Sequence, residues 1–398
     1  MHKIFPIFIS TKHDEMKFLK KILKWIVILF GLILITLYIT DTDYLIKAVR
    51  TIYLKGYSTA YLDDYKEFDN EPVENGTSQP WPNHQDYNTV KETEALNKIN
   101  KTNGTIAYVI IKNDSIWFEN YYDGYDEDSK TNSFSMAKSY VSGLMGKAIE
   151  EGYIKSLDQP VSDFLPTFNE GLAAKMTVGD LSSMCSGTNW DEAYYSPLSI
   201  TTRAYFDDDL EKVMLGLKVV DEPGKVYKYA SGDTQMLAMV IEKATGKKMY
   251  KYLEESFWKP LGCENETLWQ VDSEGHDLVK AYCCIASNAK DFARFGKLYK
   301  DHGKWNGKQI LDSAFVAKSI KPRFKESPEY GYGWWLKQQN GKDFFMMRGH
   351  LGQYVIVEPN DNVIIVRLGH SKGTNVEVAS FTEDITTYIN EAYKMLEK

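Results

Sequence analysis

The segment Ser135-Met136-Ala137-Lys138 decides how this chain is interpreted. Residues three apart on a helix lie on the same face, so the amine of Lys138 can reach the hydroxyl of Ser135. A serine hydroxyl is a poor nucleophile unless a base lies beside it, and a lysine serves as that base only when its surroundings lower its pKa. The apolar spacing that follows predicts a helix, through Val141, Leu144, Met145, Ala148 and Ile149. The tetrad alone is common by chance, so the other segments carry the decision.

Two later segments supply what an acyl-transfer site needs. Residues 223–233 (PGKVYKYASGD) lead into a helical pattern and contain Tyr229-Ala230-Ser231, a Tyr-x-Ser element whose phenol can relay a proton. Residues 344–353 (FFMMRGHLGQ) read as a strand with glycines at its end. A backbone N–H there, together with the N–H of Ser135, can form an oxyanion hole. The three segments together predict a serine hydrolase.

With these segments the chain resembles the superfamily of serine beta-lactamases, penicillin-binding proteins and esterases. Within it, the sequence is most similar to the 6-aminohexanoate-dimer (nylon oligomer) hydrolases and related carboxylesterases. The resemblance covers roughly residues 90–395 and extends to further segments in the same order, namely 181–190, 257–262, 289–296 and 330–335. Several segments in the right order are far more specific than any one of them.

The resemblance implies an α+β fold of the beta-lactamase/transpeptidase type. In that fold an antiparallel sheet is flanked by helices, with a helical subdomain against it and the site in the cleft between them. The residues themselves predict hairpins at 106–120 and 353–367, and a stretch of helix and loop from about 155 to 325. An amphipathic helix is expected from Val376 to Leu396.

The resemblance also implies roles for individual residues. Ser135 is the expected nucleophile, and Lys138 and Tyr229 are the expected acid/base pair; which of the two is the base stays open. The N–H groups of Ser135 and His350 are the expected oxyanion hole, with the N–H of Gln353 as the alternative if residues 350–352 are aligned instead. Substrate contacts are expected from Tyr194, Gly349 and Ser231.

Departures from the family pattern bear on the substrate. Tyr229-Ala230-Ser231 stands where most beta-lactamases and transpeptidases have Tyr-x-Asn or Ser-x-Asn, and Met347-Arg348-Gly349 stands where they have Lys-Thr-Gly. The missing Lys-Thr pair argues against recognition of a beta-lactam or peptide carboxylate, so an esterase or amidase is preferred. The alternatives are a beta-lactamase or D-Ala-D-Ala carboxypeptidase and, from another class, a sensor protein that is acylated once and does not turn over.

Composition excludes several other functions. The chain has 398 residues, 43% of them hydrophobic, and can bury a sizeable core. Its net charge of −8 gives no electrostatic support for nucleic-acid binding. The 7 histidines form no His-x-x-x-His pair and the 4 cysteines have no metal spacing, so we expect neither metal nor cofactor. The adjacent Cys283 and Cys284 are expected to be free thiols, as are Cys185 and Cys263.

The N-terminus predicts the location. Trp25–Thr40 is an uncharged apolar run of about 24 Å as a helix, against a bilayer core of about 30 Å, and flanking residues can extend it. Lysines precede the run, whereas Asp41 and Asp43 follow it, so the positive-inside rule places the hydrolase outside the cytoplasm. No small-x-small site follows, which favours an uncleaved single-pass anchor in the inner membrane over a signal peptide.

The expected organisation is therefore a cytoplasmic basic segment (1–21), a transmembrane anchor (22–40), an extracytoplasmic linker (41–90) and a periplasmic hydrolase domain (91–398). Met16 is an alternative start of the chain. The expected partners are the membrane, through the N-terminal helix, and a small ester, amide or peptide substrate.

Overall fold

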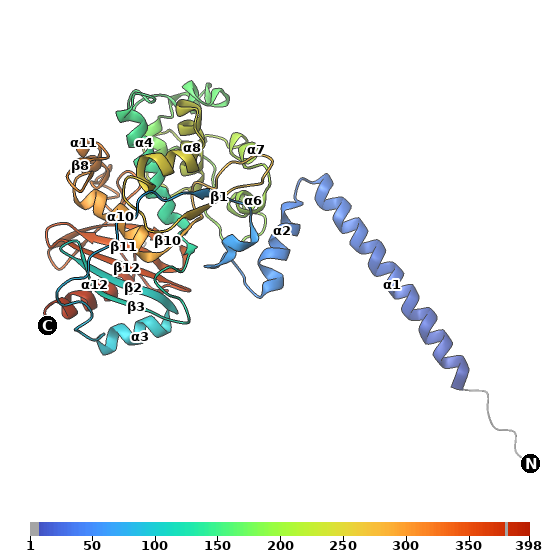
Figure 1. Cartoon of the computed structure of the whole chain (residues 1–398). Coiled ribbons are helices and arrows are strands. Elements are labelled where there is room, and N and C mark those ends of the chain that lie inside the picture. The colour runs from blue at the N-terminus through green and yellow to red at the C-terminus, as the bar shows by residue number, and fades with distance from the viewer. Residues whose placement is uncertain (1–7, 379–380) are drawn as a thin grey trace, which may run out of the picture. The chain divides into compact units, whose positions relative to one another are not determined.

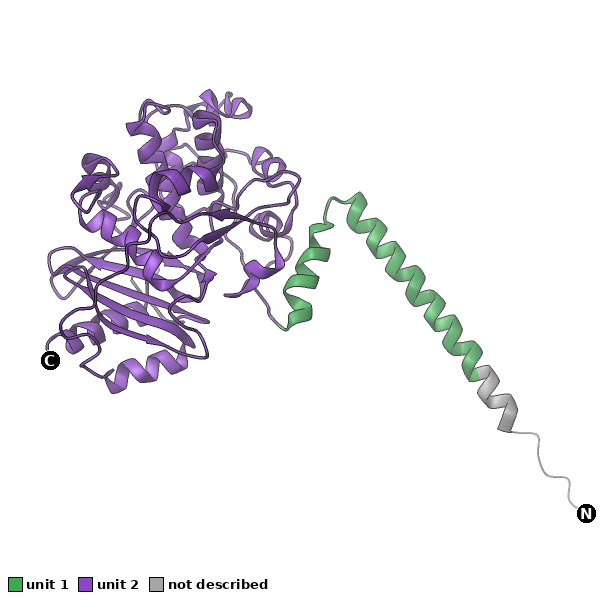
Figure 2. Cartoon of the chain, viewed as in Figure 1, with its two compact units in different colours: residues 1–56 green, residues 57–398 purple. Residues whose placement is uncertain are grey.

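The computed structural model describes residues 8–378 and 381–398, and two compact units divide the chain at residues 56 and 57 (Figures 1 and 2). The start of the expected basic segment, residues 1–7, lies outside the described residues. The first unit contains α1 (Phe8–Ile39), α2 (Tyr44–Thr51) and a 3-10 turn, η1 (Tyr53–Lys55). The second unit begins at Tyr57, so much of the stretch that we expected to be a linker belongs to the folded body.

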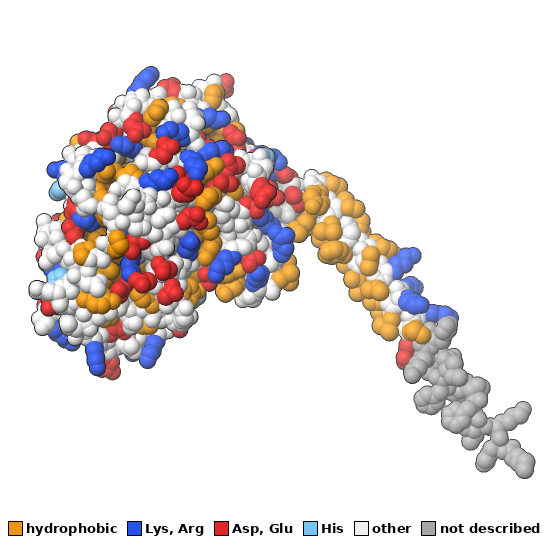
Figure 3. Space-filling view, viewed as in Figure 1, with side chains coloured by type: hydrophobic (Ala, Val, Ile, Leu, Met, Phe, Trp, Pro, Cys, Tyr) orange, Lys and Arg blue, Asp and Glu red, His pale blue; other side chains and the backbone are white. Residues whose placement is uncertain are grey.

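Helix α1 is the one described helix that is long and apolar enough to cross a membrane. Glu15–Ile39 has a mean hydropathy of 2.5 over its most apolar window, and none of that window is buried. Figure 3 shows apolar side chains along most of the coloured part of α1, with basic side chains gathered at the end of that part nearer the N-terminus. A signal sequence near an N-terminus satisfies the same criterion, so the helix is compatible with an anchor or a signal sequence.

A six-stranded antiparallel sheet with the order β3-β2-β12-β11-β10-β9 forms the larger layer of the second unit (Figure 1). Its strands are β2 (Thr105–Lys112), β3 (Ser115–Tyr121), β9 (Trp335–Gln339), β10 (Lys342–Gly349), β11 (Gln353–Glu358) and β12 (Val363–Gly369). The hairpins β2–β3 and β11–β12 are those that the sequence predicted. N- and C-terminal strands share the sheet, because β2 pairs with β12.

Alternating side chains build a core on each face of this sheet. Tyr354 and Ile356 of β11 pack with α3 (Glu94–Thr102) and α12 (Glu383–Leu396). Val355 and Val357 point the other way, against α10 (Ala289–Lys300), where a side chain on Gly296 would meet both within 3.0 Å. Successive side chains of β11 therefore point to opposite faces of the sheet, and each face packs against its own layer of helices.

The rest of the second unit is largely helical, as expected, but it also contains a second sheet that the sequence did not predict. That sheet has the order β1-β5-β6-β4, from Asn70–Val73, Thr267–Gln270, Ile285–Ser287 and Thr131–Asn132. The helices are α4 (Ala137–Glu150), α5 (Val178–Ser182), α6 (Ile200–Phe206), α7 (Leu210–Leu215), α8 (Ser231–Thr245), α9 (Met249–Leu253) and α11 (Ser313–Ser319).

Short elements complete the unit. They are η2 (Asp64–Glu67), η3 (Phe134–Met136), η4 (Val161–Asp163), η5 (Pro166–Phe168), η6 (Ala173–Lys175), the π-helical η7 (Glu254–Trp258), η8 (His350–Gly352), β7 (Lys304–Trp305), β8 (Lys308–Gln309), β13 (Val376–Val378) and β14 (Phe381–Thr382).

Two expectations were wrong. The C-terminal helix begins at Glu383, because the preceding residues form β13 and β14. Cys283 and Cys284 form a disulfide, whereas Cys185 and Cys263 are free and buried as expected. Cys284 has a left-handed φ of 77°. Residues with a side chain rarely adopt this backbone conformation, so the sequence did not predict it.

Candidate active site

The Ser-x-x-Lys segment lies where the second sheet ends and α4 begins. Ser135 is in the 3-10 turn η3, just before the α-helix rather than within it, and Lys138 is in the first turn of α4. The Lys138 Nζ lies 2.9 Å from the Ser135 Oγ and donates to the carbonyl of Tyr282 at 2.8 Å. Phe134, directly before the serine, has a left-handed φ of 46°. The turn thus presents the hydroxyl to the lysine.

Burial alters the chemistry of the lysine. Lys138 is only 3% exposed, and this loss of solvent lowers its pKa from 10.5 to about 8. The negative charge of Glu192 acts in the opposite direction and holds the pKa up. A lysine with this pKa is neutral in a useful fraction of molecules near neutral pH, which a general base requires.

Tyr229 approaches the same pair from the segment before α8. The Lys138 Nζ lies 5.2 Å from the centre of the tyrosine ring. Burial raises the pKa of Tyr229 and the charge of Glu192 raises it further, while a hydrogen bond with Ser135 and the charge of Arg348 oppose the shift. The phenol therefore keeps its proton at neutral pH and is suited to donate it.

Glu192 is a component of the site to which the sequence gave no role. Its carboxylate accepts from the Ser231 N–H at 2.8 Å and the Ser231 hydroxyl at 2.5 Å, and from the indole of Trp190 at 2.7 Å. The hydroxyl of Tyr194 donates to it as well. The one sequence signal was an acidic residue shortly after Ser186-Gly187, and sequence alone does not show which side chains such a residue contacts.

A pocket of about 390 Å³, open to solvent, surrounds the serine hydroxyl. Its walls are formed by Ser135, Tyr194, Tyr229, Trp335, Arg348, Gly349, His350 and Lys372. The structure thus brings most of the predicted residues to one place and adds Trp335, Arg348 and Lys372. Ser231, expected to contact substrate, is buried on Glu192 and is not part of this wall.

Gly349 allows the end of β10 to lie against residues 133–136, the turn that carries the expected nucleophile Ser135 and is called the nucleophile turn. A Cβ atom at this position would come within 2.3 Å of the carbonyl oxygen of Ser133. Only a residue without a side chain permits this approach, which brings the backbone of His350 to the pocket beside Ser135. The same apposition lets the ring of His350 contact the ring of Phe134, edge to face at 5.5 Å.

The imidazole of His350 is enclosed. Its ring stacks on that of Tyr194 with centres 5.2 Å apart. Burial, together with the positive charge of Lys372, lowers the pKa of His350 to about 4. The imidazole is therefore neutral at pH 7 and forms part of the pocket wall.

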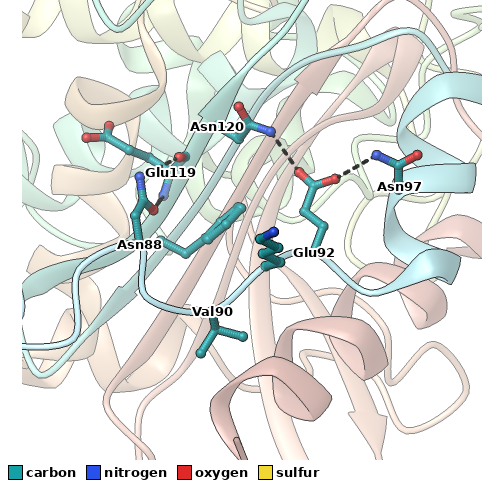
Figure 4. A pocket seen from close by; sticks show the side chains of 8 residues that line it. Asn88, Val90, Glu92, Asn97, Glu119 and Asn120 are labelled. Carbon is teal, nitrogen blue, oxygen red and sulfur yellow. Dashed lines mark hydrogen bonds between the residues drawn. The ribbon is translucent and has the colours of Figure 1, made fainter.

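A larger hollow of about 770 Å³ lies along β3 and shares no residue with the pocket of Ser135 (Figure 4). Its central carboxylate, Glu92, accepts from Asn120 at 3.0 Å and from Asn97 at 3.3 Å. Asn88 binds the backbone of Glu119 through both ends of its amide. These polar groups satisfy one another and complete the edge of the sheet, so we assign no chemistry to this hollow.

Among the described residues, no group of three or more His, Cys, Asp or Glu side chains is arranged to hold a metal ion.

Comparison with known proteins agrees with this geometry. The family model described as Beta-lactamase matches residues 95–385. The chain belongs to the beta-lactamase family. The 6-aminohexanoate-dimer hydrolase of Paenarthrobacter ureafaciens is 23% identical over 287 residues, which is 66% of this chain and 72% of that one. Membership makes this protein a serine hydrolase of the beta-lactamase superfamily, as the sequence predicted.

Solved structures confirm the beta-lactamase/transpeptidase-like fold. A structure from Bacillus anthracis, whose name assigns it to the 6-aminohexanoate-dimer hydrolases, superposes with a TM-score of 0.69 at 21% identity. That alignment covers 83% of this chain and 91% of the other. A family VIII carboxylesterase superposes with a TM-score of 0.59 at 17% identity, over 76% of this chain and 95% of the other. At these identities the likeness shows the fold alone.

Proposed function

We propose that this member of the beta-lactamase family is a membrane-anchored hydrolase that cleaves an ester or amide through an acyl-enzyme on Ser135. One observation carries the proposal: the 2.9 Å contact between the Ser135 Oγ and the amine of Lys138, whose pKa burial lowers to about 8. This arrangement supplies a nucleophile and its base in one contact.

The opposite pKa shifts of the two neighbours support a division of labour. Lys138 in its neutral form accepts the proton of Ser135 as the hydroxyl attacks the carbonyl carbon. Tyr229, which remains protonated, donates to the leaving alcohol or amine and is then reprotonated from Lys138. The N–H groups of Ser135 and His350 stabilise the oxyanion. Water then attacks the acyl-enzyme, releases the acid and restores the hydroxyl of Ser135.

The substrate class follows from the family and its neighbours. One relative is named for the 6-aminohexanoate dimer and one structural neighbour is a carboxylesterase, so esters and amides are the first substrates to test. Helix α1 supports anchoring in the inner membrane with the hydrolase on the periplasmic side, because the apolar surface of its C-terminal part is exposed and the lysines lie in its N-terminal part, before the apolar run.

The test compares the full-length protein in detergent with Ser135→Ala on p-nitrophenyl butyrate. Turnover that disappears in the variant supports the proposal, and a burst of one equivalent without turnover supports the sensor function instead. Equal hydrolysis by both proteins would show that Ser135 is not the nucleophile. Ser182→Ala is a matched control, since that serine is buried against α4 and bonded to Ser142, away from the pocket wall.

A second candidate, a beta-lactamase or D-Ala-D-Ala carboxypeptidase, gains support from the pocket. The sequence lacks the Lys-Thr pair that would bind a substrate carboxylate, yet Arg348 and Lys372 both line the pocket. Burial lowers the pKa of Lys372, and the charge of Arg348 lowers it further, while the carboxylate of Asp384 opposes the shift. An anionic substrate group in the pocket would interact favourably with both cations.

Nitrocefin and an N-acetylated D-alanyl-D-alanine peptide test this second candidate beside the neutral ester. If Lys372 binds a carboxylate, Lys372→Met lowers kcat/KM for the acidic substrates by about tenfold or more and leaves the neutral ester nearly unchanged. An equal loss on all substrates would contradict carboxylate recognition at this position.

A further inference from the structure

A carboxylate near the start of the second unit is connected to the nucleophile turn. Asp64 opens η2, in the stretch that we expected to be a linker, and its side chain has no solvent exposure. One oxygen accepts from the hydroxyl of Tyr205 at 2.7 Å and from the Tyr61 N–H at 3.2 Å. The other accepts from the side-chain amide of Asn132 at 3.0 Å.

Asn132 continues the connection. It is the last residue of β4, and its backbone N–H donates to the carbonyl of Leu62 at 2.9 Å. At the far end of its side chain, the oxygen accepts the N–H of Phe134 at 2.9 Å. A carboxylate only accepts, so Asp64 attracts the NH₂ end of the Asn132 amide and directs the oxygen towards Phe134.

The bonded N–H of Phe134 lies in an unfavourable turn. Its φ of 46° is a conformation that residues with a side chain rarely adopt, and it persists only where surrounding contacts enforce it. Reversal of the Asn132 amide would place a donor against this N–H. Ser135 is the next residue, so the orientation of one buried amide affects the position of the nucleophile.

We propose that Asp64 is a positioning residue that acts through Asn132 and Phe134 to hold Ser135 in place. The catalytic part of this inference rests on the proposed function. By this connection the active site extends into the segment that begins the second unit, outside the residues 95–385 that the family model matches. Asp64 touches neither substrate nor reacting atoms, and its effect is to keep the hydroxyl within reach of Lys138.

The experiment uses the full-length protein in detergent with Asp64→Ala, Asn132→Ala and the double variant. Two quantities are measured: hydrogen exchange of the peptide that contains Phe134, and kcat and KM for p-nitrophenyl butyrate. Asp272→Ala is the matched control, because Asp272 is equally buried and accepts three backbone N–H groups that lie outside the nucleophile turn, those of Leu210, Ser273 and Leu278.

In Asp64→Ala we expect the Phe134 peptide to exchange at least about tenfold faster and kcat to fall about 10- to 100-fold, with KM within about twofold. Adding Asn132→Ala should cause little further loss, because both substitutions remove one connection. Asp64→Asn keeps an acceptor for Asn132 and should retain most of kcat, so it tests the proposal even if the alanine variant folds poorly. The control should change neither measurement.

Exchange and kcat that remain unchanged in Asp64→Ala would overturn the proposal, as would equal changes in the control or additive losses in the double variant. The exchange measurement decides positioning even if the native protein hydrolyses nothing. In that event the proposed function fails, whereas the effect of Asp64 on the nucleophile turn is still confirmed or refuted.

Discussion

At the scale of single residues, we expect the reactivity of the pocket to depend on the charge of Lys138. Its lowered pKa of about 8 means that the neutral base accumulates as pH rises through this value rather than through 10.5. We predict that kcat/KM for p-nitrophenyl butyrate rises between pH 6 and pH 9 with a midpoint near 8. Lys138→Arg, which stays charged, should lose about 10²- to 10⁴-fold. A flat pH profile in the native enzyme would contradict Lys138 as the base.

The carboxylate of Glu192 sets where that midpoint lies. Its negative charge raises the pKa of Lys138, so Glu192→Gln should lower that pKa further and move the midpoint of kcat/KM to lower pH. The pKa of Tyr229 should fall as well, because the same charge raises it. Ser231→Ala is the control: it removes the hydroxyl that donates to Glu192 at 2.5 Å but keeps the charge, so the midpoint should move little.

The site residues that the sequence predicted lie in short motifs, whereas those that it missed do not. Ser135, Lys138 and Tyr229 belong to short motifs whose spacing is visible along the chain. Glu192 and Lys372 act through contacts with residues distant in sequence, and a lone charged residue usually marks a solvated surface. Their part in the site is visible only once the fold brings them to the pocket.

At the scale of elements, the site depends on how closely β10 approaches η3. Gly349→Ala would place a methyl group against the carbonyl of Ser133, so one of the two segments must move. We predict a loss of about 1–3 kcal/mol in the free energy of unfolding and a fall in kcat of about 100-fold. Denaturant unfolding and ester kinetics measure the two effects. Gly275→Ala, at a site with no neighbour within 4 Å, should leave both quantities unchanged. If Gly349→Ala also changed neither stability nor kcat, the close approach of β10 to η3 would not be needed for activity.

The elements themselves were predictable to different extents. The hairpin β2–β3 was readable because apolar runs flank Asn113 and Asp114, which adopt φ values of 51° and 60° in the turn. The second sheet was not, because its strands have two to four residues and β1 pairs with β5 from far along the chain. Strands this short carry too few residues to show a period.

At the scale of the whole molecule, we expect α1 to determine where the enzyme is found. We predict that the full-length protein sediments with membranes and resists extraction at alkaline pH, and that deletion of residues 1–40 releases a hydrolase with unchanged kcat. The intact mass of the membrane form distinguishes an anchor from a signal sequence, since an anchor retains the residues of α1. A mature chain that starts after Ile39 would refute anchoring.

The pairing of β2 with β12 also determines when the molecule becomes active. Val109 lies opposite Val366, so two neighbouring inner strands of the sheet come from parts of the chain that are separated by most of the folded body. Long-range pairing of this kind is slow, because a large loop must close before any contact forms. A ribosome or a translocation channel delivers β12 last. The sheet therefore closes only after most of the second unit has been delivered.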